Sequence, residues 1–197
     1  MNNPSNQTVG TSAKAQTLHL SRMSILVVDD NEFVLKLVTS ILKGLEVGRV
    51  MTASDVLDGQ NLVQLSASLA EDGRHPEIDI IISELFLKSG SGVDLLKWVR
   101  QHKRDRTRFM PFIMMGGFTE PKHIRYARDN GANEFLAKPF SVNTIASRLI
   151  SVIDRPRPFV KTDKYFGPDR RRQEMLPPGQ ERRKSDSGLV EVINERD

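Results

Sequence analysis

Short apolar runs alternate with longer amphipathic stretches five times between residues 23 and 154. The runs are Ile25–Val28, Val50–Ala53, Ile78–Ser83, Phe112–Met115 and Glu134–Ala137. A short continuous apolar run is typical of a strand that is buried on both faces of a parallel sheet. This alternation restricts the chain to a few architectures, because parallel strands need crossover connections that cover the sheet.

The segments between the runs predict helices. After Asn31, which is a suitable N-cap, apolar residues recur at intervals of three and four until the helix closes near Gly44. Similar segments end at Gly73, begin at Val93, run from Pro121 to Gly131, and run from Val142 to Ile153. Five strand and helix pairs over about 130 residues predict one α/β domain with a doubly wound, five-stranded parallel sheet and right-handed crossovers.

The sequence on either side of this domain has a different composition. Residues 1–22 are rich in Asn, Ser, Thr and Gln, which predicts a flexible leader. Residues 155–197 are rich in Pro and Arg and carry most of the net charge of +4. We expect them to form a disordered or extended basic tail without a fold of its own. The domain, residues 23–154, is then nearly neutral.

Composition excludes several classes of function. The chain has no cysteine, which excludes disulfides, thiolate zinc sites and cysteine nucleophiles. No stretch approaches the roughly 20 apolar residues of a membrane span, and residues 1–22 lack the apolar core of a signal peptide. A cytoplasmic location is therefore expected. The four histidines are scattered, without metal-ligand spacing.

Ionisable residues follow several of the predicted strands. Asp29 and Asp30 follow the first strand, Glu84 the third and Lys138 the fifth. In a doubly wound sheet the carboxyl ends of the strands meet at the edge where ligands bind. Like charges a few ångströms apart repel by roughly 1–4 kcal/mol. We therefore expect Lys138, together with a cation that binds oxygen, such as Mg²⁺, to compensate the carboxylates.

This arrangement resembles the signature of bacterial response regulator receiver domains, which are CheY-like and have a flavodoxin-like fold. The resemblance covers about residues 24–154. The matching residues are Asp29-Asp30 after an apolar strand, a carboxylate at Glu84 with Gly92 eight residues later, and Lys138-Pro139-Phe140 after the fifth strand.

The resemblance implies roles for individual residues. In that family an acidic pair binds Mg²⁺, and an aspartate at the end of the third strand accepts phosphate from a histidine kinase. A Ser or Thr at the end of the fourth strand and a lysine contact the phosphoryl group. By resemblance, Asp29 and Asp30 are the Mg²⁺ ligands, Glu84 completes the acidic pocket at the phosphoacceptor position, and Lys138 is the lysine. The two switch positions are Gly116 and Phe135.

Two departures change the expected function. The carboxylate of Glu84 stands one methylene further out than that of an aspartate, on the order of 1.5 Å, and phosphoryl transfer depends on close positioning. Gly116 has no hydroxyl, and Thr119 lies three residues later. We expect a phosphorylation-independent signalling module rather than an enzyme, with weak Mg²⁺ binding. It acts on a protein partner, either a histidine kinase or a downstream signalling protein, through the face of the fourth and fifth helices around Phe135. A homodimer is an open alternative.

Two rival functions remain open. The chain could be a conventional phosphorelay acceptor that uses Glu84, or a binder of nucleic acid or another anionic surface through its tail. Two basic clusters in the tail share a glycine, an acid and three bases, and they offer contacts for an anionic partner: Arg170, Arg171 and Arg172, then Arg182, Arg183 and Lys184. No helix-turn-helix follows the domain, so direct readout of DNA sequence is not expected.

Overall fold

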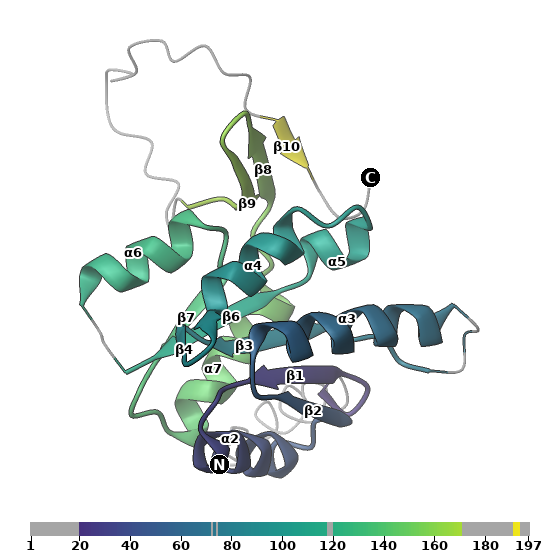
Figure 1. The fold of residues 1–197 in the computed structure, drawn as a ribbon, viewed down its shortest axis with the longest axis vertical. Helices are drawn as coiled ribbons and strands as arrows, with labels where there is room; N and C mark the ends of the chain where they lie inside the picture. Colours follow the sequence, from purple (N-terminus) through teal and green to yellow (C-terminus); the bar gives the residue numbers. More distant parts are fainter. Residues whose placement is uncertain (1–19, 72, 74, 118–119, 171–190, 194–197) are drawn as a thin grey trace, which may run out of the picture.

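A parallel five-stranded sheet forms the centre of the molecule (Figure 1). The computed structural model describes residues 20–71, 73, 75–117, 120–170 and 191–193. The strands are β1 (Ser24–Val28), β2 (Arg49–Ala53), β3 (Ile80–Glu84), β6 (Phe112–Gly116) and β7 (Glu134–Ala137). Their order, β2-β1-β3-β6-β7, is that of a doubly wound sheet whose winding reverses between β1 and β3. The predicted fold class is confirmed.

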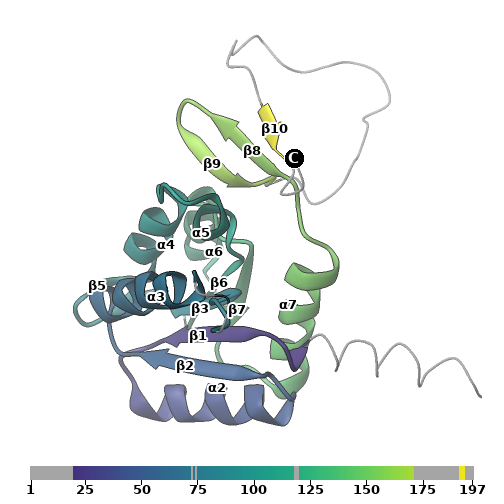
Figure 2. The same ribbon diagram turned by 90° about the vertical axis from the view of Figure 1, so that its right-hand side faces the viewer.

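Helices cover both faces of this sheet (Figures 1 and 2). On one face lie α2 (Glu32–Gly44) and α7 (Val142–Asp154), and on the other lie α3 (Val56–Ala70), α4 (Gly92–Arg100) and α6 (Pro121–Asp129). Alternate residues of β1 lie on opposite faces of the sheet. Leu26 packs with α3 and α4, and Ile25 packs with α2 and α7. Burial on both faces explains why β1 and β6 are continuous apolar runs, whereas the edge strand β2 is only partly buried. None of the described helices has the length and hydropathy to cross a membrane.

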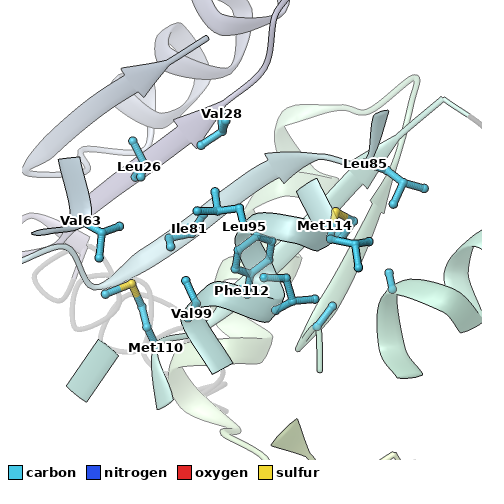
Figure 3. Close-up of a cluster of buried hydrophobic side chains, with 14 of the residues drawn as sticks. Leu26, Val28, Val63, Ile81, Leu85, Leu95, Val99, Met110, Phe112 and Met114 are labelled. Atoms are coloured by element: carbon cyan, nitrogen blue, oxygen red, sulfur yellow. The ribbon is translucent and has the colours of Figure 1, made fainter. Parts of the chain in front are cut away.

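The larger apolar cluster lies between the sheet and the α3 and α4 side (Figure 3). Leu26, Ile81 and Phe112 of the sheet face Leu95 and Val99 of α4, and all five side chains are fully buried. Burying one such side chain contributes about 1.5–3 kcal/mol. This packing fixes α4 against β3 and therefore fixes the loop that follows Glu84.

The ends of two helices follow from local sequence. Asn31 caps α2, as predicted, by accepting a hydrogen bond from the backbone N–H of Phe33 at 3.0 Å. Ser91 and Asp94 form a capping box at the start of α4. Within residues 23–154, three elements were not predicted because they are too short to show a period. They are β4 (Phe86–Leu87), β5 (Gly90–Ser91) and α5 (Asp105–Phe109).

The predicted leader begins to pack before its expected end at residue 22. Residues 1–19 lie outside the described part of the chain. The carbonyl of Leu20 accepts hydrogen bonds at 3.0 Å from the N–H groups of Met23 and Gly48, and its side chain packs against the apolar cluster under α2 and α7. The domain therefore starts at or before Leu20.

The expectation that a tail without a fold starts at residue 155 needs correction in its first part. The chain continues into an antiparallel hairpin formed by β8 (Phe159–Thr162) and β9 (Tyr165–Pro168). A third strand, β10 (Glu191–Ile193), pairs with the other edge of β8, so the order is β10-β8-β9. Figure 2 shows this small sheet beside α4 and α5. Residues 171–190 and 194–197 lie outside the described part.

Aromatic contacts hold the hairpin on the domain. The ring of Phe159 lies 4.8 Å from that of Phe109 in α5, and Phe166 lies 5.2 Å from Phe109. The guanidinium of Arg108 sits 4.6 Å above the ring of Phe166, and that of Arg100 sits 5.1 Å above Phe159. The aromatic residues of this segment, and not only its charges, therefore determine where it packs.

Polar contacts fix the segment that leads into the hairpin. Arg157 donates to the carboxylate of Glu134 at 2.9 Å and to the carbonyl of Asn133 at 3.0 Å. Arg170, predicted as a contact for an anionic partner, lies 3.2 Å from Asp129 and stacks over the ring of Tyr165. One cation of the first basic cluster is therefore already paired within the chain. The other five predicted tail contacts lie outside the described residues.

Candidate functional site

The predicted site residues meet at the carboxyl ends of the central strands. Asp29 follows β1, Glu84 ends β3, Gly116 ends β6 and Lys138 follows β7. β1, β3, β6 and β7 are consecutive neighbours in the sheet, so residues far apart in sequence come together. The structure joins Asp29, Glu84 and Lys138 in one group of ion pairs.

Lys138 bridges the two buried carboxylates. Its Nζ donates to Oδ2 of Asp29 at 2.8 Å and also contacts Oε2 of Glu84. Asp29 is 1% exposed and Glu84 7%, whereas the side chain of Lys138 keeps 23% of its surface in solvent. Two negative charges therefore share one positive charge, and the group carries a net charge of −1.

The environment keeps Lys138 charged. Burial alone favours the neutral amine, but the hydrogen bonds and charges of Asp29 and Glu84 outweigh it and raise the pKa of Lys138 above its ordinary value of 10.5. At neutral pH the amine is a permanent cation within the site. Lys138 therefore supplies one of the positive charges that the clustered carboxylates require.

The carboxylate of Glu84 has partners on both oxygens. Oε1 accepts hydrogen bonds from the N–H groups of Leu85 at 2.9 Å and Phe86 at 3.2 Å, while Oε2 faces Lys138. The longer side chain thus folds back over the start of its own loop. Together these contacts hold the carboxylate in one orientation.

Asp30 is oriented differently from Asp29. Its Oδ2 accepts a hydrogen bond from the backbone N–H of Lys88 at 2.6 Å, which ties the end of β1 to the loop after β3. Asp29 is also committed, because its Oδ1 accepts from the N–H of Asn31 at 2.8 Å and its Oδ2 from Lys138. The carboxylates of the predicted acidic pocket therefore do not form one group: Asp29 and Glu84 pair with Lys138, whereas Asp30 binds the loop after β3.

The carboxylates are of the chemical type that binds Mg²⁺, but their side chains are not oriented toward a common ion. Hard oxygen ligands are what this ion prefers, and Asp29 and Asp30 are consecutive in sequence. Among the described residues, however, no group of three or more His, Asp or Glu side chains is arranged to hold a metal ion. An ion at this edge would have to compete with Lys138 for Asp29.

The two predicted switch positions lie against each other. A Cβ atom added at Gly116 would stand 3.3 Å from Cζ of Phe135 and 3.7 Å from Oε1 of Glu84. Phe135 is buried, so its ring occupies the space beside the missing side chain. A residue larger than glycine at position 116 would require the ring of Phe135 to shift by a few tenths of an ångström. Thr119 lies outside the described residues.

Gly92 has a packing role that explains its distance from Glu84. A Cβ atom at Gly92 would stand 2.0 Å from the carbonyl oxygen of Glu84, so only glycine allows α4 to start so close to the end of β3. Its N–H also donates to the carbonyl of Leu85 at 3.1 Å. Gly92, eight residues after Glu84, therefore holds in place the loop that contains the two N–H donors to Glu84.

One residue near the site was missed from the sequence. Phe86 directly follows the loop donor Leu85, is half exposed, and meets the ring of His123 edge-on at 5.3 Å. This contact joins the loop after Glu84 to α6. A single phenylalanine in a short loop gives no periodic signal, so no pattern distinguished it from a core residue.

Comparison with known proteins identifies relatives of this chain and of its fold. The family described as response regulator receiver domain matches residues 25–150. The transcriptional regulatory protein KdpE of Staphylococcus aureus is 29% identical over 131 residues, which are 66% of this chain and 49% of KdpE. The chain therefore spans about half the length of that relative.

Solved structures give the same result for the fold. The chemotaxis response regulator CheY4 of Vibrio cholerae is 26% identical, with a TM-score of 0.53, over 66% of this chain and 98% of that one. The receiver domain of the histidine kinase CKI1 from Arabidopsis thaliana, solved with Mg²⁺ and BeF₃⁻, is 22% identical with a TM-score of 0.61. That match covers 73% of this chain and 97% of the other, and it supports the fold alone.

Proposed function

This chain belongs to the response regulator receiver family of two-component signalling, and we propose that it is an atypical member that acts without phosphorylation by binding a protein partner. The observation that carries the proposal is the state of Glu84 at the position where the family has its phosphate-accepting aspartate. Both oxygens of its carboxylate are engaged, by Lys138 on one side and by two backbone N–H groups on the other.

This geometry disfavours attack on a phosphodonor. A nucleophilic oxygen needs an open approach in line with the leaving group, and Glu84 is only 7% exposed. Gly116 provides no hydroxyl to contact a phosphoryl group, and Phe135 lies against it. The negative charge of Glu84, held next to Lys138, supports a receiver domain whose signalling state does not depend on phosphorylation.

The surface around α6, β7 and α7 is the proposed contact for the partner. Phe135 is buried, so it would act from beneath this surface rather than in the contact itself. Tyr126 of α6 and Val142 at the start of α7 are half exposed and offer apolar area. The partner is a signalling protein such as a histidine kinase or a downstream component, as in the family.

The first test is exposure of the full chain to a small phosphodonor with Mg²⁺, followed by intact mass measurement. We expect no stable phosphorylated species, because Glu84 is engaged on both oxygens and Gly116 has no hydroxyl. A mass increase of one phosphate that maps to Glu84 would instead support the phosphorelay function.

Two variants separate the contributions of the long side chain and the missing hydroxyl. Glu84→Asp alone should be phosphorylated poorly, and Glu84→Asp with Gly116→Ser should be phosphorylated faster. Serine is chosen because, among the residues with a hydroxyl, its small side chain requires the smallest shift of the Phe135 ring. If the single variant were as active as the double variant, the hydroxyl would have no role.

The second test concerns Mg²⁺. We propose that Asp29 and Asp30 bind the ion weakly, because it must compete with Lys138 for Asp29. A ligand at about ten times its dissociation constant stabilises the folded chain by about 1.4 kcal/mol, which is measurable as a shift in thermal unfolding. Asp30→Asn should abolish the shift.

Competition gives this prediction a second measurement. Lys138→Met should tighten Mg²⁺ binding in calorimetric titration, because it frees one oxygen of Asp29 and removes a positive charge. Lys97→Met, which changes an exposed lysine of α4, is the matched control. The absence of Mg²⁺ binding in both the original chain and the Lys138→Met variant would reject the site.

A further inference from the structure

The strand β8 has two pairing edges that are closed in different ways. On one edge it pairs with β9 over four residues through the short connection at Asp163 and Lys164. On the other edge it pairs over three residues with β10, which follows β9 only after residues 169–190. An edge strand presents unpaired N–H and C=O groups that can receive another strand.

The hairpin itself is firmly attached to the domain. Phe159 of β8 is 4% exposed and packs on Phe109. Gly167 of β9 approaches the backbone so closely that a Cβ atom there would stand 2.8 Å from Cα of Gly131. The β9 side of the hairpin is thereby closed by the domain, and the β8 edge faces β10.

We propose that the β8 edge is a docking site for an extended acidic segment of a partner protein, and that β10 occupies it in the free chain. Binding of this kind draws its affinity from main-chain hydrogen bonds and its specificity from alternate side chains. In the register of the two strands, Glu191 lies opposite Lys161, Val192 opposite Val160, and Ile193 opposite Phe159.

This register describes the partner segment. It runs antiparallel to β8, with an acidic residue opposite Lys161 and apolar, strand-favouring residues opposite Val160 and Phe159. Charge favours the same choice, because the hairpin, residues 159–168, contains two lysines, Lys161 and Lys164, and one acid, Asp163. An acidic segment would meet a hairpin with a net positive charge.

The strand that covers the edge is suited to being replaced. β10 makes three residue pairs with β8, although it has the advantage of belonging to the same chain. A partner segment that pairs over more residues, or that is held close by a second contact, can overcome that advantage. Arg157, which leads into β8, is held by the carbonyl of Asn133 just before β7, whereas the acidic site lies beyond the other end of β7 at Lys138. The docking site is therefore independent of the proposed function.

The experiment uses the full chain and a full-length variant with a disabled β10, Val192→Pro with Ile193→Pro. Consecutive N–H groups of a strand point to opposite sides, so one of the two prolines removes a donor on the β8 side. The probe is a fluorescein-labelled synthetic peptide of residues 187–197. We expect the variant to bind the peptide at least tenfold more tightly than the original chain.

Two methylated peptides distinguish strand pairing from attraction by charge. One is N-methylated at Val192, the other at Glu191 and Ile193. One of them should lose binding to the variant and the other should retain it, because only alternate N–H groups face β8. Equal binding of both peptides, or no binding of the parent peptide, would overturn the proposal. Concentration-dependent dimerisation of the original chain that the two prolines abolish would also overturn it, since the occupant would then be a second copy.

Discussion

Replacement of Lys138 by methionine is expected to lower the free energy of unfolding by about 3 kcal/mol, the lower end of the range for breaking a buried ion pair. The variant leaves Asp29 and Glu84 buried without their shared cation. The lower end applies because the side chain of Lys138 is 23% exposed. Urea unfolding at pH 7, followed by the fluorescence of Trp98, measures the loss.

The pH dependence provides a check on the cause. Because the folded pKa of Lys138 is raised above 10.5, its contribution is fully present below pH 10.5 and disappears as the pH rises through the folded value. The difference in stability between the original chain and Lys138→Met should therefore be constant near neutral pH and shrink only above pH 10.5. The matched control, Lys97→Met on the exposed surface of α4, should change stability by less than about 0.5 kcal/mol. A loss of the same size in both variants would contradict a role for the ion pairs.

The central sheet was predictable because each strand carries its own signal. Ile25–Val28 is apolar on both faces, and the observed strand buries both faces. The third strand was predicted to start at Ile78, two residues before the start of β3 at Ile80. Ile78 is fully buried, so burial extends beyond the paired residues and hydropathy alone cannot locate the end of a strand.

The meeting of the site residues was predictable, but the details of their contacts were not. The topology of the sheet dictates that Asp29, Glu84 and Lys138 share one edge. The path of the Glu84 side chain depends on two backbone N–H groups of the next loop. That loop is held by Gly92 on α4, and these distances arise only when the tertiary structure forms.

The hairpin was missed because its partners are distant in sequence. Phe159 and Phe166 lie within a segment, residues 155–170, that contains five basic residues, and this composition favoured a solvated tail. Their partners Phe109 and Arg100 lie about 50 residues earlier in the chain, in α5 and at the end of α4. A strand of four residues cannot be recognised by its period when it is stabilised by a surface that the sequence does not identify.

Replacement of Phe159 by alanine is expected to lower the free energy of unfolding by about 3 kcal/mol, at the lower end for loss of a buried aromatic ring. Phe159 is 4% exposed and contacts the rings of Phe109 and Phe166. Its loss also removes the ring beneath the guanidinium of Arg100. The matched control is Phe33→Ala, since Phe33 is 73% exposed on α2 and should contribute less than about 0.5 kcal/mol.

The same residue tests whether the two ends of the domain are independent. β7 runs from Glu134, which pairs with Arg157 at the base of the hairpin, to the residue before Lys138. If the strand is a rigid spacer, the losses from Phe159→Ala and Lys138→Met should add to within about 0.5 kcal/mol in the double variant. A larger interaction energy would mean that docking of the hairpin and pairing of Lys138 influence each other through β7.

Equal stability of Phe159→Ala and Phe33→Ala would contradict the docked hairpin, because burial of an aromatic ring cannot be without effect on unfolding.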